Sequence, residues 1–497
     1  MAVIAAPANT LEAPDRRAWG EALARVARYV PMLAVMALTI GIHVPTLDAY
    51  FFGDDFLVLG DVNSQSFPAY MGDVVLLRDL TPNWRPLTMA VYYGEHALFG
   101  LDPMPWRIVN LAAHAATVAM LYVTVLSITK RVFVATAAAL IFGVSSSAVH
   151  TVTYITAFPH VLSELLLVSS LYALHRYVEG EERRPAWYWC SFALYVLGFL
   201  ANEGGVVIGV VLFAYYFFFS FMRRGDPLEL AVKMAPFALA AIALVGGFAG
   251  CGCQGVDNGF YGVGWHIPQA TWIYMSRMAY PVGQIRIDPT ALEWAVGSVV
   301  AAAAIFFVVR GPNIARVAAI ATIAALMPYA PGKIWTATRY TYMALPFFAI
   351  LVGVGAGFVY HHARRVNVAA ANVLAVAALA TAGGLLAWQT IDQTDPFLDE
   401  TERWEVLTTG LREQYADIPP GTTVFVVDDE GIWSNAFWQA TWMPSVGRAL
   451  WGEDRAVHAL PAEFIGPVTR NLDPTMYLVV EYRDGEFRKS SAASVAP

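Results

Sequence analysis

The sequence predicts an all-α polytopic membrane protein with about eleven transmembrane helices and a small C-terminal extracytoplasmic α/β domain. Of the 497 residues, 57% are hydrophobic and only 14% are charged, whereas soluble domains are about 45–50% apolar and about 25% charged. Long stretches, such as 132–163, contain no Asp, Glu, Lys or Arg. Because a helix needs about 20 apolar residues to cross the hydrocarbon core, such stretches predict membrane spans.

The apolar runs divide the chain into alternating spans and connections. We expect spans at residues 29–47, 107–128, 132–150, 160–178, 186–202, 204–221, 230–250, 291–309, 314–330, 340–360 and 367–388. Cytoplasmic loops carry an excess of Lys and Arg. The N-terminal segment and every second connection after it hold 16 of the 31 basic residues, the opposite connections hold seven, and the C-terminal tail holds eight. The sequence therefore predicts a plasma-membrane or inner-membrane protein with a cytoplasmic N-terminus and an extracytoplasmic C-terminus.

Composition changes mark three parts of the chain. We expect a polar cytoplasmic segment at 1–28, a transmembrane domain at 29–388 and an extracytoplasmic domain at 389–497. Two long outward loops, 48–105 and 251–291, interrupt the transmembrane domain.

Local patterns refine the outward parts. Within the second loop, the amphipathic stretch 268–280 is typical of a helix lying in the membrane interface. In the tail, 422–429 and 476–487 predict strands, the second with an Asp-Gly turn.

Charge and cysteine content exclude several function classes. The net charge of −8 argues against a nucleic-acid partner, which requires a basic face. Three cysteines are too few for a disulfide framework, and Cys251 with Cys253 could equally form a strained bridge or remain two thiols. The long first apolar run, after a polar and Arg-containing segment, does not fit a cleavable signal peptide.

Two adjacent carboxylates follow the first predicted span. Asp54 and Asp55 lie in the run YFFGDDF, at the membrane surface among aromatic residues. This placement suits a general base, or a base plus a metal ligand, acting on a substrate whose leaving group is held in lipid. The alternative is a helix N-cap followed by a first-turn acid.

The segment NWRPLT places Arg85 in the same outward loop. An Arg at the membrane surface can bind phosphate with two parallel hydrogen bonds. The alternative is that Arg85 pairs with a loop acid such as Asp79.

Ionisable residues also stand at the next two outward turns. His150 and His160 flank the turn between spans three and four, Glu164 lies one turn further into the bilayer, and Glu203 occupies the following outward turn. Ionisable groups inside a membrane usually face a cavity and serve function, although a His or Glu at the end of a span can equally be structural.

The segment KIWTATRYTY directly precedes the tenth span. Lys333 and Arg339, with Tyr340 and Tyr342, suit an anionic headgroup, or they are aromatic-belt and snorkelling residues. All four clusters fall on the outward side. Together they favour one outward cavity that binds a phosphorylated lipid and a hydrophilic partner.

The order of these motifs resembles the GT-C superfamily of polyprenyl-phosphate-sugar-dependent glycosyltransferases. The likeness is greatest to the protein O-mannosyltransferase type and its relatives with tetratricopeptide repeats. It covers about 51–346 and is strongest in 83–114. The resemblance implies a GT-C-like fold and transfer of a hexosyl or mannosyl group from a polyprenyl-phosphate donor to a protein, lipid or glycan acceptor.

The resemblance also implies roles for individual residues. One of Asp54 and Asp55 would be the base, and Asp55 would be the candidate ligand of a Mg²⁺ or Mn²⁺ ion. Arg85 and Arg339 would line the site or hold the lipid phosphate, and His150 would match a histidine of the family. From their place on the outward side, we add Lys333 and His160 to the candidate donor-binding residues. The site would further be lined by Glu164, Glu203, Tyr340 and Tyr342. The sequence departs from the family at Val152, where a Glu is usual, at Asn202, where a Lys is usual, and in having no repeat array after the last span.

A second hypothesis is a non-catalytic GT-C-like scaffold or accessory subunit of a larger membrane complex. It would dock partner proteins through its lipid face or its tail. The tail gathers Trp433, Phe437, Trp438, Trp442 and Trp451 in one stretch, which would form either a partner surface or the core of the small domain. A transporter is disfavoured because the sequence has no inverted-repeat symmetry.

Overall fold

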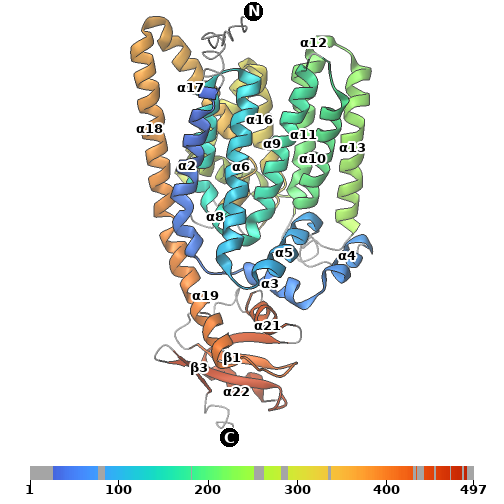
Figure 1. Cartoon of the computed structure of the whole chain (residues 1–497), viewed down its shortest axis with the longest axis vertical. Helices are drawn as coiled ribbons and strands as arrows, with labels where there is room; N and C mark the ends of the chain where they lie inside the picture. Colours follow the sequence, from blue (N-terminus) through green and yellow to red (C-terminus); the bar gives the residue numbers. More distant parts are fainter. Residues whose placement is uncertain are drawn as a thin grey trace, which may run out of the picture.

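The computed structural model describes residues 26–76, 84–180, 182–250, 262–280, 289–333, 337–428, 433, 442–452, 455–470, 472–483 and 486–489. Long helices run side by side in a bundle, and a small domain with a β-sheet lies beyond one end of it (Figure 1). This arrangement confirms the predicted fold class.

Helices occupy all eleven predicted spans. Within the described residues, eight are long and apolar enough to cross a membrane. Their main helices are α2 (Val30–His43), α6 (Pro103–Thr129), α9 (Phe158–Glu179), α11 (Val206–Tyr216), α13 (Pro227–Gly250), α15 (Ala291–Arg310), α17 (Leu345–Val366) and α18 (Val368–Asp392). A ninth candidate span is a bent pair of helical segments with an angle of 48° between them, if the pair is one span. The two segments are α7 (Val132–Gly143) and Ser146–Thr153, which ends in α8 (Val149–Thr153). The remaining two predicted spans are the shorter helices α10 (Pro185–Ala201) and α16 (Asn313–Leu326).

Local sequence fixes where several spans begin. A backbone in lipid has no water to bond, so its polar groups must be satisfied internally. Pro103 opens α6 and Asp102 accepts a hydrogen bond from the N–H of Met104. Thr290 and Glu293 form a capping box at the start of α15. Both devices satisfy N–H groups that the first helical turn leaves unpaired.

The described residues of the loop predicted at 48–105 contain three α-helices. They are α3 (Asp55–Ser64), α4 (Phe67–Leu76) and α5 (Pro86–Phe99), and they lie at the end of the bundle nearest the small domain (Figure 1). Gly53 permits the turn into α3, because its φ is +58° and a Cβ there would lie 2.7 Å from Tyr154 Oη. In the second outward loop, α14 (His266–Ala279) matches the helix expected at 268–280. The Cys251–Cys253 alternative falls outside the described residues.

The small domain carries a four-stranded sheet. The connecting helix α19 (Asp395–Gln414) leads to strands in the order β2-β1-β3-β4, with β1 parallel to β2 and β3, and β3 antiparallel to β4. The strands are β1 (Thr423–Val427), β2 (Ala456–Leu460), β3 (Tyr477–Arg483) and β4 (Glu486–Lys489), with helices α21 (Met443–Trp451) and α22 (Ala462–Thr469). The strands expected at 422–429 and 476–487 match β1 and the β3–β4 pair, and β2 was not predicted. Trp433 is buried in this domain, whereas Phe437 and Trp438 lie outside the described residues.

The small domain contacts the bundle through α21, which packs on α3. Gly60 of α3 allows this close approach, since a Cβ there would lie 3.2 Å from the carbonyl oxygen of Ser445. Asn63 donates from Nδ2 to the carbonyl oxygens of Arg448 and Ala449, at 3.0 and 3.2 Å. These contacts hold the C-terminal domain against the helix that follows the acidic pair.

Candidate functional site

A polar cavity of about 210 Å³ lies at the end of the bundle that faces the small domain; it is called the site cavity below. Residues from the first outward loop, the α8–α9 turn, the α10–α11 turn and the segment before α17 line it together. They are Asp54, Leu57, Val58, Asp61, Tyr70, Arg85, Thr88, Met89, Tyr92, Thr156, Pro159, His160, Glu203, Tyr329, Arg339 and Tyr340.

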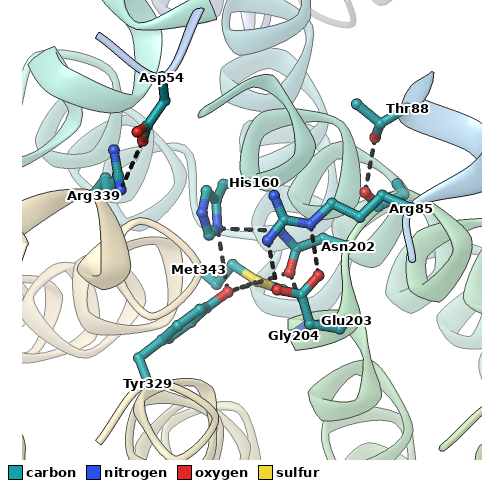
Figure 2. Close-up of polar contacts among 11 residues, drawn as sticks. Asp54, Arg85, Thr88, His160, Asn202, Glu203, Gly204, Tyr329, Arg339 and Met343 are labelled. Carbon is teal, nitrogen blue, oxygen red and sulfur yellow. Dashed lines mark hydrogen bonds and ion pairs between the residues drawn. The ribbon is translucent and has the colours of Figure 1, made fainter. Parts of the chain in front are cut away.

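Asp54 presents its carboxylate to the site cavity. Oδ2 lies 3.3 Å from Arg339 Nη2 (Figure 2), and Oδ1 accepts a hydrogen bond from Trp442 Nε1 at 2.6 Å. The Asp54 backbone N–H donates to Tyr154 Oη. Although Asp54 occupies the N-cap position of α3, its side chain makes no capping hydrogen bond. Helix capping therefore does not account for this carboxylate.

Asp55 points the other way and is fully buried. Its Oδ1 accepts hydrogen bonds from the Thr156 backbone N–H and hydroxyl, at 2.9 and 3.2 Å, and Oδ2 accepts one from the Phe52 N–H. Burial raises the pKa of Asp55 to about 6, although the nearby Arg107 opposes the rise. Asp55 thus ties the start of α3 to the α8–α9 turn and does not line the cavity.

The buried Arg107 positions this whole segment. Its guanidinium donates to the carbonyl oxygens of Ala49, Tyr50 and Thr153. These bonds join the end of the first span to the turn that carries Thr156. Arg107 was not among the predicted site residues.

Arg85 and Glu203 form the opposite wall of the site cavity. Arg85 Nε and Nη2 donate to the two carboxylate oxygens of Glu203, at 2.6 and 2.5 Å (Figure 2). Thr88, one turn after Arg85, donates to the carbonyl oxygen of Ala201, which fastens α5 to the end of α10. The alternative was that Arg85 pairs with a loop acid such as Asp79. Arg85 does pair with an acid, but that acid is Glu203, and Asp79 lies outside the described residues.

His160 joins this wall to an aromatic one. Its Nδ1 lies 3.2 Å from Tyr329 Oη and 3.4 Å from Asn202 Nδ2 (Figure 2). The ring of Tyr329 stacks on that of Tyr340, with centroids 4.8 Å apart. The site cavity therefore combines carboxylates, guanidinium groups and flat aromatic surfaces.

Besides Asp55, four predicted site residues lie away from the site cavity. Lys333 is exposed and packs against Gly262, and His150 faces the ring of Phe397. The hydroxyl of Tyr342 points into the core and lies 2.7 Å from His114 Nδ1.

The fourth, Glu164, lies in the interior of the bundle. It is fully buried, and neither carboxylate oxygen has a hydrogen-bond partner among the described residues.

Several residues at the site were not identified from the sequence, among them Asp61 and Trp442. Asp61 lines the cavity seven residues after Asp54, with Leu57 and Val58 between them, a spacing that puts all four on one face of a helix. Burial raises the pKa of Asp61 to about 6. This spacing could have revealed Asp61 had α3 been predicted as a helix. Trp442 carries no such signal, because it reaches Asp54 across 388 residues of chain.

A metal ion does not fit the donor set at Asp55. Both oxygens already accept hydrogen bonds, and the charge that acts on Asp55 most strongly is the Arg107 guanidinium. Across the described ranges, no group of three His, Cys, Asp or Glu side chains could hold an ion. Mg²⁺ and Mn²⁺ prefer several oxygen ligands, so the donor set at Asp55 fits neither ion.

No protein-family model matches the sequence, and no curated protein matches it. Solved structures do match the fold. ArnT from Cupriavidus metallidurans bound to undecaprenyl phosphate is 12% identical with a TM-score of 0.50, covering 91% of this chain and 93% of that one. The oligosaccharyltransferase AglB from Archaeoglobus fulgidus, in complex with an inhibitory peptide and a dolichol-phosphate, is 11% identical with a TM-score of 0.54, covering 92% and 70%. The chain thus shares the GT-C-like fold of these membrane proteins.

Proposed function

We propose that this chain is a membrane glycosyltransferase that moves a sugar from a polyprenyl-phosphate donor to a hydrophilic acceptor on the outer face of the membrane. The observation that carries the proposal is the meeting of the Asp54 carboxylate and the Arg339 guanidinium in the site cavity, 3.3 Å apart. The fold supports it, since two solved proteins of this fold hold undecaprenyl phosphate and a dolichol-phosphate.

In the proposed reaction, the acceptor attacks the anomeric carbon while its proton passes to Asp54. The bond between the anomeric carbon and the phosphate oxygen breaks, and the polyprenyl phosphate leaves with the bonding electrons. Direct displacement inverts the anomeric carbon. General base catalysis of this kind contributes about 10²–10⁴-fold.

Arg339 is the group we assign to the leaving phosphate. Protonation of Asp54 removes the charge that holds Arg339, just as negative charge develops on the phosphate oxygen. The Arg339 guanidinium can then interact with the negative charge that develops on the phosphate oxygen, and this interaction stabilises the transition state electrostatically. Arg85 is less suited, because Glu203 already occupies two of its nitrogens.

The finer proposals follow from the sequence. The donor we propose first is a polyprenyl-phosphate hexose, with mannose leading because the motifs resemble the protein O-mannosyltransferase type. The acceptor is a protein, lipid or glycan. The basic residues favour a plasma or inner membrane location with the site cavity and the C-terminal domain outside. A non-catalytic scaffold would have no need for a base and a cation in one cavity.

The experiment is a transfer assay with the purified chain in liposomes. Polyprenyl-phosphate mannose, glucose and aminosugar donors are each offered with peptide, lipid and glycan acceptors, and released polyprenyl phosphate is measured. We expect turnover with one donor class and its loss in Asp54→Asn. The matched control is Asp73→Asn, which removes a carboxylate from α4 that bonds Gln65 outside the cavity; it should keep full turnover. No turnover with any donor, with a folded protein, would overturn the proposal.

A further inference from the structure

A second hollow lies at the opposite end of the bundle. It is a groove of about 870 Å³ between α2, α7, α17 and α18, called the α18 groove below. The helix α18 begins there and runs toward the small domain along the edge of the bundle (Figure 1). The groove shares no residue with the site cavity.

We propose that the α18 groove binds an anionic phospholipid, with its acyl chains along α18 and its phosphate at Lys130, Arg131 and Arg364. The proposal does not depend on the function proposed for the site cavity. It rests on the length of the groove, its apolar walls and the charge at its mouth.

The groove has the length of one membrane leaflet. Along α18 its lining runs from Asn372 to Gly384, which is about 18 Å of helix. Half of the hydrocarbon core measures about 15 Å. An acyl chain anchored at the mouth would therefore be covered along its whole length.

The walls are apolar and leave room beside the bundle. Leu38, Phe133, Leu140 and Leu379 line them, and a Cβ on Gly384 would meet no atom within 4 Å. Only 11% of the most apolar window of α18 is buried in the protein. The open side of this space therefore faces lipid tails.

The mouth carries cations without a matching acid. Lys130, Arg131 and Arg364 are all exposed, and none of the described residues lining the groove is Asp or Glu. Among the described residues, none of the three forms an ion pair. The first turn of α7 follows directly after Arg131, and a helix N-terminus adds further attraction for a phosphate.

An aromatic bridge holds the mouth in shape. The Tyr360 ring stacks on Phe133 with centroids 4.6 Å apart, and its hydroxyl donates to Asn372 Oδ1 at 2.8 Å. The Arg364 guanidinium lies 5.6 Å from the Tyr360 ring centroid. These contacts join α7, α17 and α18 where a headgroup would sit. A zwitterionic lipid such as phosphatidylcholine carries its own cation, which opposes the attraction of its phosphate to the three basic residues. An anionic lipid has no such cation and would gain both the apolar walls and the full attraction.

The test is lipid binding to the purified full-length chain, measured by native mass spectrometry in detergent. Phosphatidylglycerol and phosphatidylcholine with the same acyl chains are compared. We expect phosphatidylglycerol to bind at least about tenfold more tightly, since a basic residue near a membrane surface contributes about 1 kcal/mol toward anionic lipid. Arg131→Gln/Arg364→Gln leaves Lys130 in place and should reduce that preference severalfold. The matched control, Arg184→Gln/Arg310→Gln, removes two exposed cations outside the groove and should keep it.

A steric variant separates the groove from the surface charge. Gly384→Phe places a ring in open space and should fold normally, yet bind neither lipid. Equal binding of the two lipids, or an unchanged preference in Arg131→Gln/Arg364→Gln or Gly384→Phe, would overturn the proposal. So would displacement of phosphatidylglycerol by an equal amount of undecaprenyl phosphate, or a dimer that must dissociate before lipid binds.

Discussion

On one wall of the site cavity, Arg85 and Glu203 meet through two short hydrogen bonds. On the other, Asp54 meets Arg339 through a single contact at 3.3 Å and takes its second partner, Trp442, from the C-terminal domain. Both pairs are partly shielded from solvent. In the second pair, however, each oxygen of Asp54 has a different partner, so one contact can break while the other remains. The difference supports the proposal that the first wall is a fixed support and the second is the reactive side.

The support wall should carry the largest stability effect. Glu203→Gln leaves the Arg85 charge without its counter-ion. Breaking a fully buried pair costs about 3 kcal/mol or more, so this partly shielded pair should lose up to about 3 kcal/mol. Thermal unfolding in detergent measures this loss. The double variant Arg85→Met/Glu203→Leu should recover most of it, because no unpaired charge remains. If Glu203→Gln melts like the wild type, the two walls do not differ in the way described.

Asp55 should show the next largest effect, and a pH dependence of its own. In Asp55→Asn, an NH₂ group replaces one of the two carboxylate oxygens, both of which accept hydrogen bonds from Phe52 or Thr156. Two donors then face each other, and the lost hydrogen bond costs about 1–3 kcal/mol. Because the pKa of Asp55 is raised to about 6 in the folded protein, the folded state holds a proton between about pH 4 and pH 6 that the unfolded state has released. Stability from this group therefore falls as the pH rises through that window.

Melting midpoints at pH 4.5 and pH 7 check the sign. The wild type should lose more stability than Asp55→Asn on going to pH 7. An equal change in both proteins would contradict the assigned environment of Asp55.

A smaller effect is expected from Trp442→Phe. The variant keeps a ring to pack on Phe52 and Trp404 but removes the N–H that holds Asp54 Oδ1. A hydrogen bond to a charged group contributes about 1.5–3 kcal/mol, so kcat/KM should fall about tenfold or more. Donor binding should stay unchanged. A change in donor affinity with no change in turnover would contradict the idea that Trp442 acts by positioning Asp54.

The smallest effect belongs to the contact between α3 and α21. Arg448 Nη1 lies 3.8 Å from Asp61 Oδ1, and both side chains are partly exposed. Exposed pairs of this kind contribute less than about 1 kcal/mol. Arg448→Gln should therefore shift the melting midpoint only slightly. A large shift would mean that the C-terminal domain depends on this pair rather than on packing at Gly60 and Asn63.

The spans and most of the sheet were predictable because each depends on a continuous run of sequence. A run of about twenty apolar residues predicts a membrane-spanning helix wherever it occurs, and the β1 run TVFVV has the composition of a buried strand. The arrangement of the site was harder to predict from the sequence. Asp54 and Asp55 are adjacent in sequence, and only the turn at Gly53 and the partners Thr156 and Trp442 send them in opposite directions.

Long-range contacts account for the rest. Tyr340 and Tyr342 stand two residues apart, yet one lines the cavity and the other binds His114. Nothing in the segment itself distinguishes them, because the distinction comes from helices packed against it. The pairing of Arg85 with Glu203 likewise joins residues 118 positions apart.

The most direct measurement compares Asp54→Asn with Asp55→Asn, using the donor and acceptor that the wild type accepts. Turnover, donor binding and melting midpoint are recorded for each. Asp54→Asn should fold and bind donor, with a smaller loss of melting midpoint than Asp55→Asn, but lose at least about 100-fold in turnover. Asp55→Asn should melt earlier, with turnover retained by the folded fraction. Full turnover in Asp54→Asn, or lost turnover in a fully stable Asp55→Asn, would contradict the assignment of Asp54 as the base.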